Sequence, residues 1–64
     1  MKETLAQIKA PHFVAGIILH DDRVTDGADI VRYMVRDKWT RQRVREYCEK
    51  KKWEVYVVYE REEK

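Results

Sequence analysis

The sequence has few of the residues that crosslink a chain, interrupt it or carry chemistry. Its 64 residues include one cysteine, one proline and two glycines, and neither serine nor asparagine occurs. A lone Cys48 cannot form an internal disulfide, so folding does not depend on oxidation and a cytoplasmic location is expected. The longest apolar stretch is residues 13–19, far shorter than the roughly 20 residues that span a bilayer. The first ten residues have no apolar signal core.

The same scarcities argue against an enzyme. Two glycines leave no phosphate-binding glycine loop and no nucleophile elbow. His12 and His20 would lie roughly 26 Å apart along an extended strand, too far to share a metal ion. Cys48 falls on an apolar helical stripe, so we expect a buried structural thiol rather than a nucleophile. The sequence therefore predicts a non-enzymatic protein without a cofactor or a metal site.

Charge is what the chain has in abundance. Charged residues make up 41% of the sequence, 14 Lys+Arg against 12 Asp+Glu, for a net charge of +2. The 44% hydrophobic content is too high for a disordered chain, and the length fits a single small domain over residues 1–64. Abundant charge with few amides is typical of proteins from hot environments. A thermophilic source is therefore one hypothesis.

The N-terminal half predicts a hairpin after an ambiguous opening segment. In residues 1–11, Leu5 and Ile8 have helical spacing, so a short helix and a loosely ordered arm both remain open. Residues 13–19 form a continuous apolar run typical of a covered or central strand. Asp21 and Asp22 would reverse the chain in a two-residue turn. Gly16 is expected to mark a bulge or a helix close to the strand.

Two adjacent helices are predicted next. The first would begin at Asp26, which can cap it. Its apolar face would comprise Ile30, Val31, Met34 and Val35. The second would begin after Thr40, a good cap, with Trp39 packing against Val44, and its stripe is Val44, Tyr47 and Cys48.

The chain ends in a predicted strand. Residues 53–60 alternate in a way that indicates one well-buried face, and residues 61–64 read as a solvated tail. Pairing this strand with residues 13–19 gives an α+β fold, in which a hairpin plus the C-terminal strand form a small sheet and two adjacent helices pack on one face. The edge of the last strand could pair with its copy, so a homodimer is a further expectation.

Positive charge is concentrated in the predicted helical pair. Residues 28–52 hold nine bases and four acids, net +5, whereas residues 1–27 are net −1 and residues 53–64 are net −2. Arg41, Arg43 and Arg45 crowd the first turns of the second helix, where the helix dipole disfavours cations. Guanidinium groups beside the free N–H groups of a helix N-terminus would suit a phosphate. The candidate nucleic-acid or anion-binding residues are Arg36, Lys38, Arg41, Gln42, Arg43, Arg45 and Lys52.

Three interpretations of these bases stay open. They can be a solvated face whose long side chains flank a buried stripe, with Glu46 and Lys50 as an ion pair. They can bind nucleic acid, for which residues 36–39 form a link of suitable length for a helix-turn-helix but contain no glycine. They can also dock on an acidic surface of a host protein, as an inhibitor or adaptor would. An exposed apolar patch around Tyr33 or Trp39 would favour that last interpretation.

One resemblance bears on origin. Within the segment from Val24 to Val55, residues 28–34, 39–40, 44–48 and 51–53 in particular carry a resemblance to small uncharacterised proteins of bacteriophages and prophages, and residues 11–16 fit as well. The likeness covers about two thirds of the chain and includes no catalytic motif. Such proteins often carry glycine before the closing tryptophan, where this chain has Lys52, so the end of the second helix is an open point. The resemblance implies a phage-type accessory protein and no particular activity.

Overall fold

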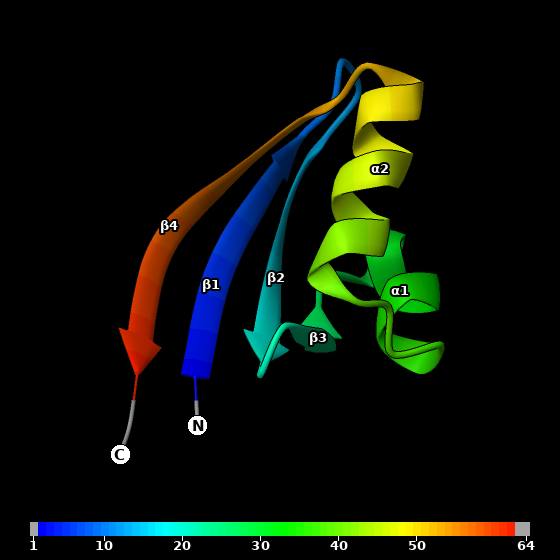
Figure 1. Cartoon of the computed structure of the whole chain (residues 1–64). Coiled ribbons are helices and arrows are strands. Elements are labelled where there is room, and N and C mark those ends of the chain that lie inside the picture. The colour runs from blue at the N-terminus through cyan, green and yellow to red at the C-terminus, as the bar shows by residue number, and fades with distance from the viewer. Residues whose placement is uncertain (1, 63–64) are drawn as a thin grey trace.

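The computed structural model describes residues 2–62 as a four-stranded antiparallel sheet with both helices on one face (Figure 1). The strand order is β3-β2-β1-β4. The α+β class expected from the sequence is confirmed. The elements are β1 (Lys2–Lys9), β2 (Val14–His20), β3 (Arg23–Gly27), a 3-10 turn (Asp29–Val31), α1 (Arg32–Arg36), α2 (Arg41–Lys51) and β4 (Glu54–Glu62). No helix among these residues is long and apolar enough to cross a membrane.

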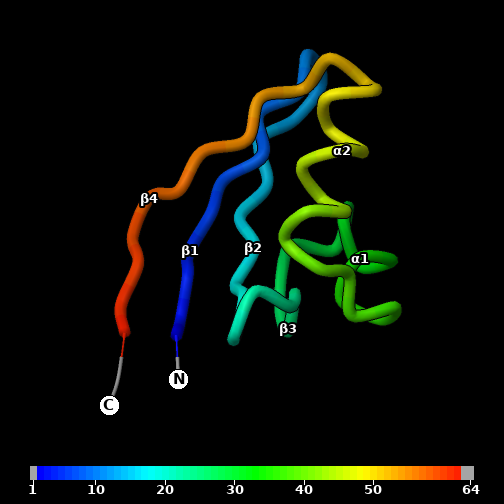
Figure 2. The backbone as a smooth tube through the Cα atoms, in the orientation of Figure 1, coloured from blue at the N-terminus to red at the C-terminus, as the bar shows by residue number. Residues whose placement is uncertain are grey.

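The N-terminal segment is a strand, and both the helix and the loose arm expected there are wrong. β1 lies inside the sheet between β2 and β4 (Figure 2). Thr4, Ala6 and Ile8 point into the core at the two-residue period of a strand. The helical spacing of Leu5 and Ile8 was misleading, because Leu5 lies on the opposite, exposed face.

The position of β1 also changes the predicted strand pairing. β4 pairs with β1 and not with β2, because β1 occupies the place beside β2. The predicted turn between β2 and β3 is confirmed. Asp21 and Asp22 both have positive φ, 51° and 66°, as a two-residue turn of the favoured hairpin type requires.

The core lies between the sheet and the helices. Its centre comprises Ile8, Ile17, Leu19 and Met34, each at most 2% exposed. Gly27, at the end of β3, is where the backbone comes closest to a neighbour. A Cβ there would lie 3.1 Å from Ile17 Cγ2 and 3.3 Å from the Gly16 carbonyl oxygen. Gly16 itself has nothing within 4 Å of such a Cβ, so the helix expected there does not pack against it. The bulge expected at Gly16 is also wrong, because the pairing of β2 with β3 shifts between Ile18 and Leu19.

The helices begin differently. Asp26 does not cap the first helix; it belongs to β3, and its Oδ1 accepts a hydrogen bond from Gly27 N at 2.8 Å. The helical segment starts instead with a 3-10 turn after Ala28, without a side-chain cap. Thr40 caps α2 as predicted, because its hydroxyl oxygen accepts a hydrogen bond from Arg43 N at 3.2 Å. Trp39, expected to pack beside this cap, is only 7% exposed.

The C-terminal strand is correctly located, but its predicted buried face is wrong. No residue of β4 is buried, and Val55 alone is half-buried. The helices lie over the β2–β3 side of the sheet, so β4 stands away from them (Figure 1). The register with β1 also shifts: Val57 is opposite Ala6 and Tyr59 opposite Leu5, which leaves Val58 as an extra residue in a bulge. Of the predicted tail, residues 61 and 62 belong to β4, and residues 63–64 lie outside the described part.

Candidate nucleic-acid interface

Arg41 is held by acidic side chains from other parts of the fold. Its Nη1 lies 3.2 Å from Glu60 Oε1 on β4 and 3.5 Å from Asp22 Oδ1 in the β2–β3 turn. Lys2 Nζ reaches the same two carboxylates, at 3.1 Å for Asp22 and 3.4 Å for Glu60. The buried hydroxyl of Thr4 donates to Glu60 Oε1 at 3.3 Å. These ion pairs connect α2 to the sheet, so Arg41 has a structural role.

The pKa values of this group follow from the same contacts. Hydrogen bonding to Lys2 lowers the pKa of Asp22 and of Glu60 below their ordinary values, with Arg41 adding to the effect. The two carboxylates in turn raise the pKa of Lys2. All of them stay charged near neutral pH, so the cluster is a set of satisfied ion pairs.

The first turn of α2 has little free capacity for a phosphate. Arg41 N donates to the Asp22 carbonyl oxygen at 2.7 Å, and Arg43 N donates to the Thr40 hydroxyl. Asp21 and Asp22 line the same shallow depression as the helix tip. Two of the N–H groups expected to receive an anion are therefore occupied, and the neighbouring carboxylates would repel one. The proposed reading tip of a helix-turn-helix is closed for the same reasons.

Arg43 lies on the opposite flank of α2, toward α1, and rests on an aromatic cluster. Its guanidinium carbon is 4.4 Å from the centre of the Trp39 ring, a cation–π contact. Trp39 in turn packs edge-on against Tyr33 and Tyr47, with ring centroids 5.5 and 5.2 Å apart. The indole Nε1 of Trp39 is buried without a hydrogen-bond partner in the described residues. The arginine is thus positioned by packing while its charge faces solvent.

Burial also affects the phenol of Tyr33, which packs against Trp39. Burial and the neighbouring Tyr47 hydroxyl raise the pKa of Tyr33 well above its ordinary value. Tyr33 is half-buried and Trp39 is buried. The exposed apolar patch that would favour protein docking around these two residues therefore does not form.

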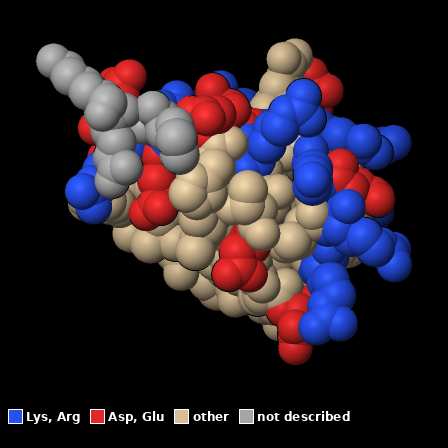
Figure 3. All heavy atoms as spheres, turned by 90° about the horizontal axis from the view of Figure 1, so that it is seen from below, with Lys and Arg blue, Asp and Glu red and all other residues tan. Residues whose placement is uncertain are grey.

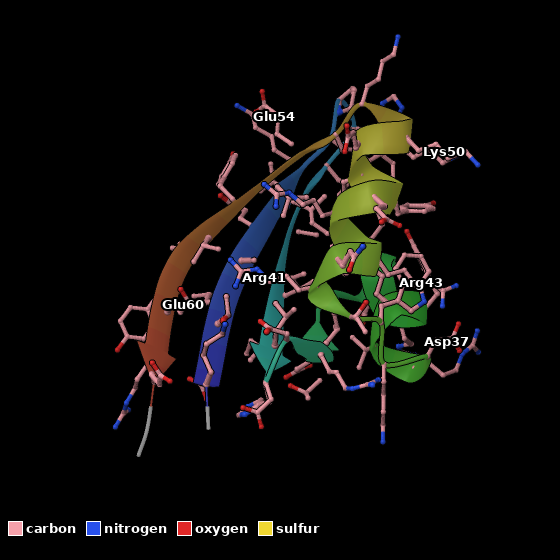
Figure 4. The ribbon with its side chains drawn as sticks, viewed as in Figure 1. Asp37, Arg41, Arg43, Lys50, Glu54 and Glu60 are labelled. Carbon is pink, nitrogen blue, oxygen red and sulfur yellow. The ribbon has the colours of Figure 1, made fainter. Side chains whose placement is uncertain are left out.

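Four of the exposed cations on the helical side of the molecule are here called the α1–α2 basic surface: Arg36, Lys38, Arg43 and Lys50. None of them forms an ion pair with another described residue. Figure 4 shows Arg43 and Lys50 on the side of α2 that faces away from β4, whereas Arg41 points toward the sheet. Seen from below in Figure 3, Lys and Arg side chains gather on the side that carries the helices.

The remaining predicted residues lie elsewhere. Arg45 joins Arg41 along a groove of about 250 Å³ between α2 and the β1–β4 strands, floored by Ala6 and Leu19. Gln42 Nε2 donates to Glu46 Oε1 at 3.0 Å, and the expected pair of Glu46 with Lys50 is not formed among the described side chains. Lys52 lies at the far end of α2, about 16 Å from Arg41 at 1.5 Å per residue.

The structure thus divides the predicted set. Arg36 ends α1, Lys38 lies in the link and Arg43 lies on the side of α2 that faces away from β4, whereas Arg41 and Arg45 line the groove toward the sheet and Lys52 lies at the far end of α2. Lys50 was not among the predicted site residues, although its spacing of seven from Arg43 places both on one helix flank. In comparisons with known proteins, the chain matches no family model, no curated protein and no solved structure.

Proposed function

We propose that this protein is a small, non-enzymatic, phage-type accessory protein that binds nucleic acid through the α1–α2 basic surface. The observation that carries the proposal is the distribution of ion pairs. The acidic residues that neutralise cations sit mostly at the sheet, around Lys2 and Arg41. Within residues 2–62 the cations of the basic surface form no ion pair, and unpaired cations are what a phosphate backbone attracts.

The backbone at Lys38 supports the same proposal. Lys38 has a φ of 49° in the link between α1 and α2, a left-handed conformation in which glycine costs less. A cation that occupies a strained position at a solvent-exposed link departs from the best local choice for stability. Such departures are more frequent where a residue serves function. Lys38 therefore counts as a candidate phosphate contact and not only as part of a turn.

The contacts favour binding to the phosphate backbone with little reading of base sequence. The tip of α2, which would enter a groove, is occupied by Asp21, Asp22 and the Arg41 ion pairs. The basic surface instead presents side chains from the end of α1, the link and one flank of α2. We expect weak dependence on sequence and strong dependence on salt, because phosphate contacts release counterions.

The test is fluorescence anisotropy of labelled duplex and single-stranded DNA at about 50 and 200 mM salt. Arg43→Glu is the test variant and Lys9→Glu the matched control, since both reverse one exposed cation and Lys9 lies on β1. Arg43→Glu should lower the affinity roughly tenfold and reduce the salt slope by about one, whereas Lys9→Glu should change both much less. Equal losses in the two variants would mean that only net charge matters.

Absence of binding at the lower salt concentration would overturn the nucleic-acid proposal. The alternative of an inhibitor or adaptor on an acidic host protein would then be preferred for the same cations. Comparing the charge reversals Arg45→Glu and Arg43→Glu distinguishes the two flanks of α2. Arg45→Glu should have less effect than Arg43→Glu, because Arg45 lines the groove toward β4.

A further inference from the structure

The two edges of the sheet differ in whether another segment of the chain covers them. The edge at β3 is covered by the link between the helices: Val24 N donates to the Trp39 carbonyl oxygen at 2.8 Å, and Arg23 forms a bridge with Thr40. The edge at β4 has no strand, helix or link beside it within residues 2–62. A long uncovered edge strand is a template for pairing with another chain.

The side chains of β4 also indicate that this edge pairs with another chain. Four consecutive apolar residues, Tyr56, Val57, Val58 and Tyr59, are between 41% and 58% exposed. Soluble proteins seldom leave such a run uncovered on an edge strand, where charges or proline are usually placed. Charged residues occur only at its ends: Glu54, separated from the run by Val55, and the residues after the run, Glu60, Arg61 and Glu62. The centre of the strand is thus built like the middle of an interface with a charged rim.

We propose that β4 pairs antiparallel with β4 of a second copy of this chain, which joins the two sheets into one of eight strands. A two-fold axis perpendicular to the sheet relates the copies. Rotation about such an axis reverses the strand direction but does not turn the sheet over, so the helices of both copies lie on the same side of the joined sheet. This inference is independent of nucleic-acid binding and concerns a surface that the basic residues do not share.

The bulge at Val58 determines which register is possible. Residues that face each other across an antiparallel pair must point to the same side of the sheet. The pairing with β1 places Val55, Val57 and Glu60 on the helix side, together with Ile8, Ala6 and Thr4. The residues on the other side are Glu54, Tyr56, Tyr59 and Arg61, which pair with Lys9, Gln7, Leu5 and Glu3. The bulge has therefore shifted the alternation by one residue.

With this shift, the two-fold axis can pass between Val57 and Val58. Glu54 then lies opposite the partner's Arg61, and Tyr56 lies opposite the partner's Tyr59, with all four on the same side of the sheet. Val57 faces the partner's Val58 at the centre. Opposite charges and aromatic pairs across strands each stabilise the pairing, and symmetry makes every contact occur twice. In this register Val55 lies opposite the partner's Glu60, away from the axis, whereas sliding the strands by two residues would bring Glu60 closer to the axis, opposite the partner's Val57.

The covered edge at β3 explains why assembly would end at two copies. After the β4 edges have paired, the outer edges of the eight-stranded sheet are the two β3 strands. In each of them Val24 N already donates to the Trp39 carbonyl oxygen, and Arg23 forms a bridge with Thr40. The β4–β4 interface is isologous, so this pairing closes at two copies.

Sedimentation equilibrium over a range of protein concentrations tests the proposal. At high protein concentration the wild-type protein should sediment with twice the mass of one 64-residue chain. Val58→Lys should raise the dissociation constant at least roughly tenfold, because two lysines would meet near the axis. Val14→Lys is the matched control: Val14 is 55% exposed, against 58% for Val58, but it lies on the central strand β2. Thermal melts of both variants establish that they fold.

The register has its own test. Glu54→Arg and Arg61→Glu should each weaken the dimer several-fold, because each sets like charges opposite one another, and the two changes combined should restore the wild-type affinity. A chain that stays monomeric at all concentrations overturns the proposal. So does a dimer that survives Val58→Lys, or one that Val14→Lys weakens equally. A dimer in which the combined change restores nothing rejects this register.

Discussion

Lys38 and Lys52 occupy equivalent positions at the ends of the two helices. Each has a left-handed backbone, with φ of 49° and 63°, and each is followed by a tryptophan. At the end of α1, Trp39 N donates to the Met34 carbonyl oxygen, and at the end of α2, Trp53 N donates to that of Cys48. Both ends have the hydrogen bonds of a Schellman motif, in which glycine usually takes the left-handed position.

We therefore expect Lys38→Gly and Lys52→Gly each to stabilise the fold by about 0.5–1 kcal/mol, because glycine adopts positive φ without a Cβ penalty. Chemical denaturation measures this. Lys50→Gly is the control: it lies inside α2 and should destabilise by roughly 1 kcal/mol. A loss of stability in Lys52→Gly would mean that the left-handed backbone carries no strain there.

Gly27 and Gly16 form a second matched pair. Gly27→Ala should destabilise by about 1–3 kcal/mol, because the new Cβ would lie 3.1 Å from Ile17 Cγ2 and close to a carbonyl oxygen. Gly16→Ala adds a methyl group in open space and should be neutral or slightly stabilising. Melting temperatures of the two variants check this, and a tolerated Gly27→Ala would contradict the close packing of β3.

Stability should fall in acid because of the ion-pair cluster around Lys2. Asp22 and Glu60 have pKa values lowered by Lys2 in the folded protein. Their contribution is thus present above their ordinary values of 3.8 and 4.5 and is lost as the pH falls through the lower folded values. Melting temperatures between about pH 2 and 7 should show this decline. Lys2→Met should make the decline shallower, and an unchanged slope would show that other carboxylates dominate.

Cys48 should react slowly with thiol reagents in the native protein. The residue is 1% exposed, and burial raises the pKa of its thiol, so both access and thiolate fraction are low. Labelling with a chromogenic disulfide near pH 8 should be slow, and unfolding in denaturant should make it fast. Fast labelling of the folded chain would place Cys48 in a frequently opening part of α2.

The features that the sequence predicted correctly depend on neighbouring residues. The Thr40 cap, the apolar stripe of α2 and the Asp21-Asp22 turn are each set within a few positions. The helix end at Lys52 was uncertain without a glycine, yet the motif forms with lysine. These determinants are local, so they can be read from spacing alone.

The errors concern contacts between distant residues. β1 was missed because its buried Thr4 looks polar in sequence, and its hydroxyl is satisfied by Glu60, which lies 56 positions away. The buried face assigned to β4 was wrong because the lateral position of the helices is set by packing. Arg41 looked free for a ligand, and only the fold reveals its carboxylate partners. Its predicted companions Arg36, Lys38 and Arg43 form no ion pair with another described residue.

Tyr47 lies between the two tryptophans, 5.2 Å from the Trp39 ring and 5.6 Å from the Trp53 ring. This arrangement gives the molecule two optical probes, one at each end of α2. Trp39 lies directly beneath Arg43 and reports on the α1–α2 basic surface, while Trp53 immediately precedes β4 and reports on the uncovered edge. Trp39→Phe and Trp53→Phe would each leave one emitter. Titration with nucleic acid and dilution of the protein would then give separate emission signals for the two surfaces, without any attached dye.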